Sequence, residues 1–240
     1  MPPKLTSSTG LCERLARVRE RVARAERRYG REPGSVVLIA ASKGQTSERI
    51  KAAVECGQRA FGENYLQEAA PKIEQHGSRQ TELSWHYIGP LQTNKTARVA
   101  RLFEWVHSVD RAKVATRLSV QRPAELGPLN ICLQVNIDRE PGKAGVLVDH
   151  LPALAEHVAR LQNIKLRGLM AIPAATGDFH RQRNRFAALR AALEGLTRRD
   201  HDIADLSMGM SADLEAAIAE GATMVRVGTA IFGPRSSARG

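Results

Sequence analysis

Short apolar runs alternate with helix-patterned segments eight times along this 240-residue chain, and no other feature restricts the possible folds so strongly. The runs are rich in Val, Ile, Leu and Ala, which is typical of strands buried on both faces of a parallel sheet. Strict alternation of such strands with helices, without a break in composition, predicts a single (β/α)8 barrel. We expect its strands at residues 36–43, 60–64, 84–90, 105–110, 130–136, 165–172, 205–208 and 224–227.

Between these runs, apolar residues recur at helical spacing, and we expect crossover helices at 46–57, 66–75, 92–102, 111–121, 146–161 and 179–196. Residues 11–29 show the same spacing ahead of the first strand and stop at Gly30, which predicts an extra N-terminal helix packed against the barrel. The predicted organisation is a disordered N-terminus at 1–10, one barrel domain at 11–234 and a flexible tail at 235–240.

The composition agrees with a cytoplasmic protein of this class. Apolar residues make up 42% of the chain and aromatic residues only 4%, as expected for strands of small aliphatic side chains covered by helices. No apolar run approaches the roughly 18 residues needed to cross a bilayer, and the first residues lack the apolar segment of a signal peptide. We therefore expect a cytoplasmic location and no membrane partner.

The cysteines and histidines show no pattern of a disulfide framework or a metal site. Cys12, Cys56 and Cys132 are odd in number, widely spaced and without a Cys-x-x-Cys pair, so we interpret them as small core fillers. The seven histidines form no His-Glu-x-x-His motif. We therefore expect no metal.

The net charge of +11 is concentrated in arginines of two helix-patterned stretches, residues 13–31 and 181–199. Such a surplus attracts polyanions and also steers phosphorylated ligands. We interpret both stretches as solvated helix faces, because no nucleic-acid-binding module is recognisable. Nucleic-acid binding is kept as the third functional hypothesis.

Two turns near the C-terminus have the composition of a phosphate site. Ser211 stands where the N-cap of a helix ending at Gly221 is expected, so free backbone N–H groups would face an anion. After the last strand, Gly228-Thr229 allows backbone N–H groups to approach a ligand closely. In eight-stranded α/β barrels, the loops after strands seven and eight commonly bind phosphate. An ordinary helix cap and an ordinary turn glycine are the alternative interpretation.

Reactive residues of such barrels lie at the C-terminal ends of strands, and Lys43 is the unusual residue among them. Among small apolar neighbours a lysine amine loses hydration and can condense with an aldehyde, whereas the alternative is an amine that extends into solvent. An aldehyde-reactive lysine beside a phosphate site indicates pyridoxal 5′-phosphate as the cofactor. Arg226 shares strand parity with Gly228, so it would point into the barrel and face the ring nitrogen. Alternatively, a carboxylate such as Asp110 or Glu63 pairs with it.

Further polar residues at strand ends complete the predicted cofactor site. Asn64 could hydrogen-bond the ring hydroxyl and His86 could stack on the ring, although both are equally ordinary as buried, satisfied polar residues. Ser207 and Met208, at the end of the seventh strand, are included as cofactor-binding residues. Residues 138–145 have the composition of a loop over the barrel mouth. No residue is assigned a catalytic or metal-binding role.

Several longer motifs run through the chain in a fixed order. They are Ala41-Ser-Lys43, Phe61-Gly-Glu-Asn-Tyr-Leu-Gln-Glu68, Trp85-His-Tyr-Ile-Gly-Pro-Leu-Gln-Thr-Asn-Lys95, His107-Ser-Val-Asp110, Leu133-Gln-Val-Asn136, Arg167-Gly-Leu-Met170, Leu206-Ser-Met-Gly-Met-Ser211 and Met224-Val-Arg-Val-Gly-Thr-Ala-Ile-Phe-Gly233. Over residues 11–234 the chain resembles the YggS/PROSC family of pyridoxal-phosphate homeostasis proteins.

The resemblance implies a barrel like the N-terminal domain of alanine racemase. It implies that Lys43 forms the Schiff base with the cofactor and that Arg226 faces the ring nitrogen. It also implies that Ser211, Gly228 and Thr229 bind the phosphate. The loop at 138–145 departs from the Ser/Lys-rich loop usual in the family.

The leading functional hypothesis is a non-enzymatic, monomeric carrier or reservoir of pyridoxal phosphate in vitamin B6 homeostasis, with apo enzymes that use this cofactor as partners. The alternative is an amino-acid racemase dependent on the same cofactor. Racemisation needs two bases on opposite faces of the substrate. Only Tyr29, Tyr65 and Tyr87 could supply a tyrosine base. Tyr29 ends the first helix, Tyr87 has the opposite strand parity to His86, and Tyr65 fits a loop-packing residue.

Overall fold

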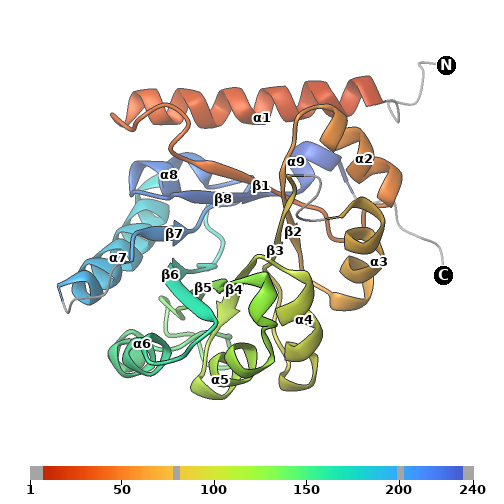
Figure 1. Ribbon diagram of the computed structural model, residues 1–240. Coiled ribbons are helices and arrows are strands. Elements are labelled where there is room, and N and C mark those ends of the chain that lie inside the picture. The colour runs from red at the N-terminus through yellow and green to blue at the C-terminus, as the bar shows by residue number, and fades with distance from the viewer. Residues whose placement is uncertain (1–7, 78–81, 199–202, 235–240) are drawn as a thin grey trace.

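Eight parallel strands close into a barrel in chain order, with the last strand paired to the first (Figure 1). The computed structural model describes residues 8–77, 82–198 and 203–234. The strands are β1 (Val37–Ala41), β2 (Ala60–Glu63), β3 (Ser84–Tyr87), β4 (Trp105–Val109), β5 (Leu129–Gln134), β6 (Ile164–Met170), β7 (Asp205–Ser207) and β8 (Met224–Val227). This closed parallel sheet confirms the predicted (β/α)8 barrel.

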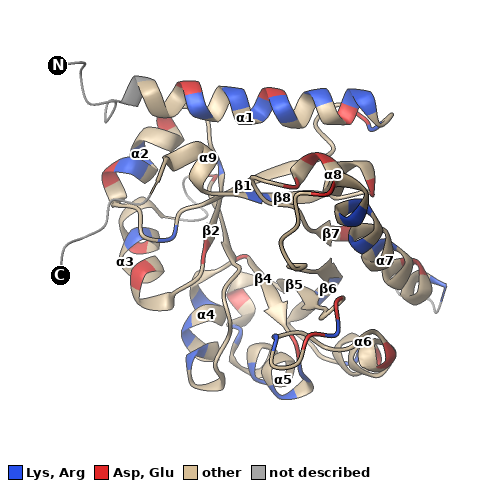
Figure 2. Ribbon diagram, turned by 180° about the vertical axis from the view of Figure 1, so that it is seen from behind, with Lys and Arg blue, Asp and Glu red and all other residues tan. Residues whose placement is uncertain are grey.

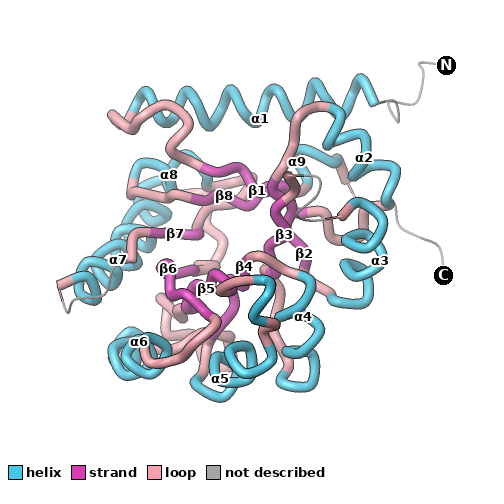
Figure 3. The backbone as a smooth tube through the Cα atoms, viewed as in Figure 1, coloured by secondary structure: helices cyan, strands magenta, loops and turns pink. Residues whose placement is uncertain are grey.

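Helices surround the barrel on its outside (Figure 3). They are α1 (Ser8–Arg28), α2 (Ser47–Glu55), α3 (Leu66–His76), α4 (Thr96–Leu102), α5 (Ala112–Gln121), α6 (Leu151–Ala159), α7 (Phe179–Thr197), α8 (Leu214–Ala219) and α9 (Thr229–Phe232), with 3-10 turns at Thr93–Lys95, Ala124–Leu126 and Val148–His150. The predicted extra helix is α1, which packs on α2, α8 and α9 (Figure 1). In the described part of the chain, no helix combines the length and apolarity needed to span a bilayer.

The largest boundary difference between prediction and structure lies before α6. The spacing predicted a helix from residue 146, whereas α6 begins at Leu151 after a 3-10 turn. Val146 instead forms a parallel bridge with Val135, and its amide donates to the Gln134 carbonyl at 2.8 Å. Pro152 was the available signal, because proline fits the first turn of a helix.

Strand alternation divides the buried side chains into two layers. Outward-facing residues such as Leu133 and Val225 pack against the helices in the main core. Inward-facing Ile39 and Met170 belong to a small second apolar cluster inside the barrel. The barrel interior also contains four buried polar side chains that are hydrogen-bonded to one another, those of His86, His107, Ser207 and Arg226. Because buried polar groups cost free energy unless they are hydrogen-bonded, their grouping identifies the interior as a candidate functional region.

A disulfide joins Cys12 of α1 to Cys56, the residue after α2, with a Cα–Cα distance of 5.4 Å. The interpretation of the cysteines as core fillers is wrong for this pair and is confirmed for Cys132, which is buried and free. Periodicity could not reveal the pairing, because the two residues lie 44 positions apart and meet only when α1 packs on α2.

Figure 2 shows basic residues along α1 and α7, the two arginine-rich stretches. Several of these arginines bind neighbouring elements. In α1, Arg14 Nε donates to the Ile231 carbonyl of α9 at 2.7 Å. In α7, Arg183 Nε lies 2.6 Å from the carboxylate of Glu220, beside α8. The interpretation of both helices as solvated faces therefore holds for only part of each.

Candidate functional site

Lys43 follows β1 at the C-terminal end of the barrel, with its backbone fixed on both sides. The Ser42 amide donates to the Gly62 carbonyl at 2.9 Å, and the Gly44 amide donates to the Glu68 carboxylate at 2.8 Å. The Lys43 side chain is half-buried. Within the described residues its amine has no hydrogen bond or ion pair. A fixed backbone carrying a free amine suits a lysine that reacts with a ligand.

Ser42, the residue before this lysine, joins a buried ion pair of Glu63 and Lys72. Lys72 Nζ lies 2.7 Å from Glu63 Oε1 and donates to the Ser42 carbonyl at 3.0 Å. The Ser42 hydroxyl donates to the same carboxylate at 2.6 Å. Burial raises the pKa of Glu63, while the Lys72 ammonium and the Ser42 hydroxyl oppose that rise. The sequence analysis did not predict this pair, because burial of Lys72 depends on how α3 packs against the barrel.

The pairing of β1 with β8 brings Lys43 next to one predicted phosphate turn. Ile39 pairs with Arg226 across the two strands, so the following residues of both strands approach each other. A Cβ added to Gly228 would lie 3.2 Å from the Ala41 carbonyl oxygen, a close approach that favours glycine. Thr229 is exposed directly after it. The turn Gly228-Thr229 therefore lies beside the end of β1, just before Lys43.

Ser211 lies in the turn between β7 and α8, two residues before the N-cap residue, Asp213. The predicted N-cap role of Ser211 is wrong, because the Asp213 carboxylate accepts from the Met210 amide at 2.6 Å and turns the chain before the helix begins. Gly209 adopts a φ of 90°, and an added Cβ there would collide with α8 at 2.5 Å. In the described structure, the amides of Ser211 and Ala212 have no hydrogen-bond partner. The turn therefore still offers backbone donors.

Arg21 of α1 supports this turn from outside the barrel. Its Nη2 donates to the Ser211 carbonyl at 3.1 Å, and its Nε lies 2.9 Å from the Glu215 carboxylate of α8. No local pattern could predict this contact, because 190 positions separate Arg21 from Ser211.

Arg226 points into the barrel, as its strand parity predicted. Nη1 donates to the Ser207 hydroxyl at 2.7 Å, and Nη2 donates to the Ala171 carbonyl at 3.0 Å. Neither Asp110 nor Glu63 binds it, so the alternative of a paired interior arginine is wrong for these two carboxylates. Burial lowers the pKa of Arg226 to about 10, which leaves the guanidinium charged at neutral pH.

Asn64 directly follows β2 and keeps an unused hydrogen-bond acceptor. Its side-chain oxygen is buried and has no partner among the described residues. Gly89 packs so closely on Asn64 that an added Cβ would collide with the Asn64 backbone. A buried acceptor without a donor costs free energy that a ligand hydroxyl could recover. Asn64 therefore remains a candidate partner for a ring hydroxyl.

His86 and Met208, both predicted to bind the cofactor, are buried in different layers of the barrel. His86 is buried inside the barrel, where its ring stacks on Trp105 with 5.6 Å between centroids and its Nδ1 lies 2.9 Å from His107 Nε2. Burial lowers the pKa of His86 to about 3. The Met208 side chain lies in the main core on the outer side of β7. Alternation along the strand explains this position, because Ser207 points inward.

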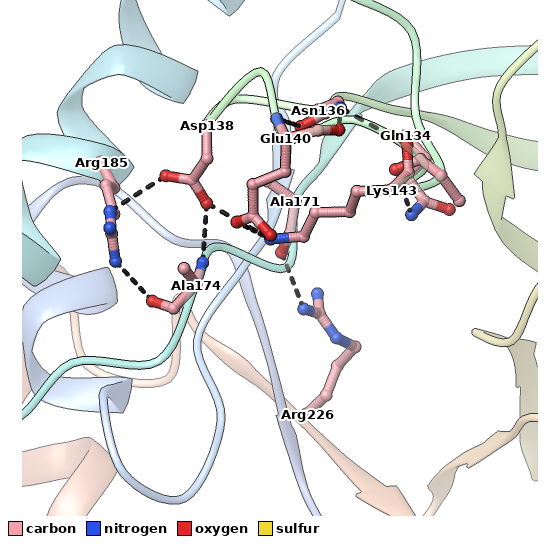
Figure 4. Close-up of polar contacts among 10 residues, drawn as sticks. Gln134, Asn136, Asp138, Glu140, Lys143, Ala171, Ala174, Arg185 and Arg226 are labelled. Atoms are coloured by element: carbon pink, nitrogen blue, oxygen red, sulfur yellow. Dashed lines mark hydrogen bonds and ion pairs between the residues drawn. The ribbon is translucent and has the colours of Figure 1, made fainter.

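The segment at 138–145 forms a loop at the end of β5, in agreement with the sequence interpretation. Asn136 Nδ2 donates to the Glu140 carbonyl at 2.8 Å, and Gln134 Nε2 donates to the Ala144 carbonyl at 3.2 Å. Figure 4 shows Lys143 between two carboxylates, with Arg226 reaching Ala171 nearby. The Lys143 amine lies 3.3 Å from Asp138 and 2.9 Å from Glu140. These contacts fix the loop and leave the Lys143 amine bound in ion pairs, unlike the amine of Lys43.

Comparison with known proteins agrees with this geometry. Residues 14–236 match the family model of the alanine racemase N-terminal domain. The pyridoxal phosphate homeostasis protein of Pseudomonas aeruginosa is 52% identical over 225 residues, which cover 94% of this chain and 96% of that protein. That of Escherichia coli is 48% identical over 226 residues, with 94% and 97% covered.

A solved structure of a similar protein contains a bound cofactor. PipY of Synechococcus elongatus, solved with PLP bound, matches with a TM-score of 0.82 and 36% identity, covering 93% of this chain and all of that one. The resemblance found in the sequence motifs is thereby confirmed. The chain belongs to the family of pyridoxal phosphate homeostasis proteins, which is built on the alanine racemase N-terminal domain fold.

Proposed function

We propose that this protein binds pyridoxal 5′-phosphate reversibly at the C-terminal end of its barrel and serves vitamin B6 homeostasis as a carrier or reservoir. The observation that carries the proposal is the free amine of Lys43 beside the turn Gly228-Thr229. The names of the relatives and the cofactor bound in PipY support the same ligand.

The residues present fit this cofactor. The Lys43 amine would add to the aldehyde carbon and release one water, which gives a Schiff base. The amide and hydroxyl of Ser211, the close backbone at Gly228 and the Thr229 hydroxyl would hold the phosphate. The unused acceptor of Asn64 suits the ring hydroxyl. The hydrogen-bonded pair of Ser207 and Arg226 would face the ring nitrogen.

When bound, pyridoxal phosphate supplies an aldehyde and an electron-withdrawing ring, but this chain offers little to exploit them for racemisation. The Tyr87 hydroxyl donates to the Pro90 carbonyl at 3.1 Å, and its ring packs edge-on against Phe103 in the outer core. Tyr29 lies beyond the last residue of α1, and Tyr65 is 56% exposed ahead of α3. Without a tyrosine base opposite Lys43, a carrier explains the site better than a racemase.

The carrier role sets the expected partners and state. Hydrolysis would release the cofactor from Lys43 without any further reactant, so bound cofactor could pass to an apo enzyme that uses pyridoxal phosphate. The protein would do this as a cytoplasmic monomer, and the arginine-rich helices would take no part in binding nucleic acid.

The function is tested by loading the purified protein with pyridoxal phosphate and following its absorption during gel filtration, dialysis and incubation with an apo enzyme. A yellow protein that restores the apo enzyme supports the carrier. A parallel incubation with L-alanine in deuterated water addresses the alternative. Rapid Cα deuteration together with D-alanine would show that the protein is a racemase.

A further inference from the structure

Polar side chains form one continuous row of hydrogen bonds across the barrel interior. From β8 to β3 the row contains Arg226, Ser207, His107, His86 and Ser84, hereafter the interior relay. The successive distances between its polar atoms are 2.7, 2.7, 2.9 and 3.1 Å. The row crosses from β7 to β4, which are not neighbours in the sheet, and so spans the barrel.

Arg226 sets the direction of the first two bonds. A guanidinium has donors only, so the Ser207 oxygen must accept from it. Ser207 is fully buried, and its hydroxyl hydrogen also needs an acceptor. Among the described residues, the acceptor within reach of that hydroxyl is His107 Nδ1. Ser207 therefore donates to His107.

The direction then propagates through both imidazoles. Because His107 Nδ1 accepts, a neutral His107 carries its proton on Nε2 and donates to His86 Nδ1. His86 in turn carries its proton on Nε2 and donates to the Ser84 hydroxyl. Burial lowers the pKa of both histidines, which agrees with two neutral rings. One arrangement of protons therefore satisfies the whole row.

The interior relay holds a charge that no carboxylate in the described structure neutralises by direct contact. Among the described residues, Arg226 is hydrogen-bonded only to the Ser207 hydroxyl and the Ala171 carbonyl, both uncharged. Asp213 influences its pKa without a hydrogen bond or ion pair between them. A buried cation needs hydrogen-bond partners, and aligned neutral dipoles provide them without cancelling its charge.

We propose that the interior relay solvates the Arg226 guanidinium with aligned neutral dipoles, so that its positive charge stays available to the ligand site. Ser207, His107 and His86 are thus positioning residues. Given the proposed cofactor, on which this step rests, the charge opposes protonation of the ring nitrogen. A carboxylate at the position of Ser207 would neutralise the positive charge of Arg226.

The proton arrangement is tested in the ligand-free protein by long-range 1H–15N NMR of its histidine rings. The variants His86→Gln and His107→Gln assign the two patterns. We expect both rings to be neutral and protonated on Nε2, and Ser207→Ala to release the fixed tautomer of His107. Ser108→Ala is the matched control, because its buried hydroxyl has no partner in the described residues, and it should change neither ring. A charged ring, or a proton on either Nδ1, would overturn the proposal.

The effect on the ligand is tested with 15N-labelled pyridoxal phosphate in the wild type and in Ser207→Asp. The ring-nitrogen signal should be that of an unprotonated pyridine in the wild type and should move toward the protonated value in the variant. An unchanged signal in folded, loaded Ser207→Asp would contradict the proposal. If this variant does not fold, His107→Leu replaces it, and His107→Gln, which retains a donor and an acceptor, should restore the wild-type signal. Correct tautomers without cofactor binding would instead refute the proposed function and leave the relay intact.

Discussion

The two sides of the barrel mouth are held by ion pairs that differ in burial. Around Lys43, carboxylates bind the neighbouring groups, with Glu63 accepting from the Ser42 hydroxyl inside the protein. At the turn proposed to bind the phosphate, Arg21 of α1 binds the Ser211 carbonyl with a partly exposed side chain. The lysine side is thus fixed by a buried pair and the phosphate side by an outer helix. Damage to the first should be severe, and damage to the second should be mild and confined to phosphate affinity.

Breaking the buried pair on the lysine side should give the largest effect. Lys72→Met leaves the Glu63 carboxylate buried without its counter-charge, which typically costs about 3 to 5 kcal/mol of unfolding free energy. Urea unfolding measures this loss. Lys51→Met, at an exposed position of α2, is the control and should change stability little.

The same variant has a defined pH dependence. Burial raises the pKa of Glu63 in the folded state, and such a carboxyl contributes stability below its unfolded pKa and loses it as the pH rises through the folded value. Without Lys72 to oppose the rise, the variant should be closer to wild-type stability near about pH 5 than near about pH 8. If the stability difference between the variant and the wild type grew on acidification, the buried charge of Glu63 would not be the cause of the lost stability.

Removing the two side-chain hydroxyls that are proposed to bind the phosphate should give the second-largest effect. Hydrogen bonds to a charged group contribute about 1.5 to 3 kcal/mol each, so Ser211→Ala with Thr229→Ala should weaken pyridoxal phosphate binding at least about tenfold. Titration with pyridoxal, which lacks the phosphate, is the internal control and should change little. Equal losses for both aldehydes would show that these residues do not bind the phosphate.

Removing the contacts that Arg21 of α1 makes with the turn should give the smallest effect. Arg21→Gln removes the contact with Ser211 and the partly exposed ion pair with Glu215, and we expect a loss of roughly two- to fivefold in pyridoxal phosphate affinity. Arg24→Gln on the same helix is exposed and should have no effect. If Arg21→Gln reduced stability as strongly as Lys72→Met, the distinction between the two sides would fail.

Local patterns in the sequence were sufficient for the fold and for part of the site. Apolar runs placed all eight strands, and alternation along β8 placed Arg226 inside the barrel. Contacts between distant segments left no such pattern. The bond from His107 to Ser207 joins residues 100 positions apart, and the bond from Arg21 to Ser211 joins residues 190 apart. Burial of Lys72 likewise depends on how α3 packs.

The most direct test of the account is to reduce the loaded protein with borohydride and map the modified peptide by mass spectrometry. Reduction makes the bond between cofactor and lysine permanent, so the attachment site is preserved through digestion. We predict that the pyridoxyl group is on Lys43 and that Lys43→Ala abolishes both the adduct and the yellow colour. An adduct on Lys95 or Lys143 with Lys43 unmodified would contradict the account.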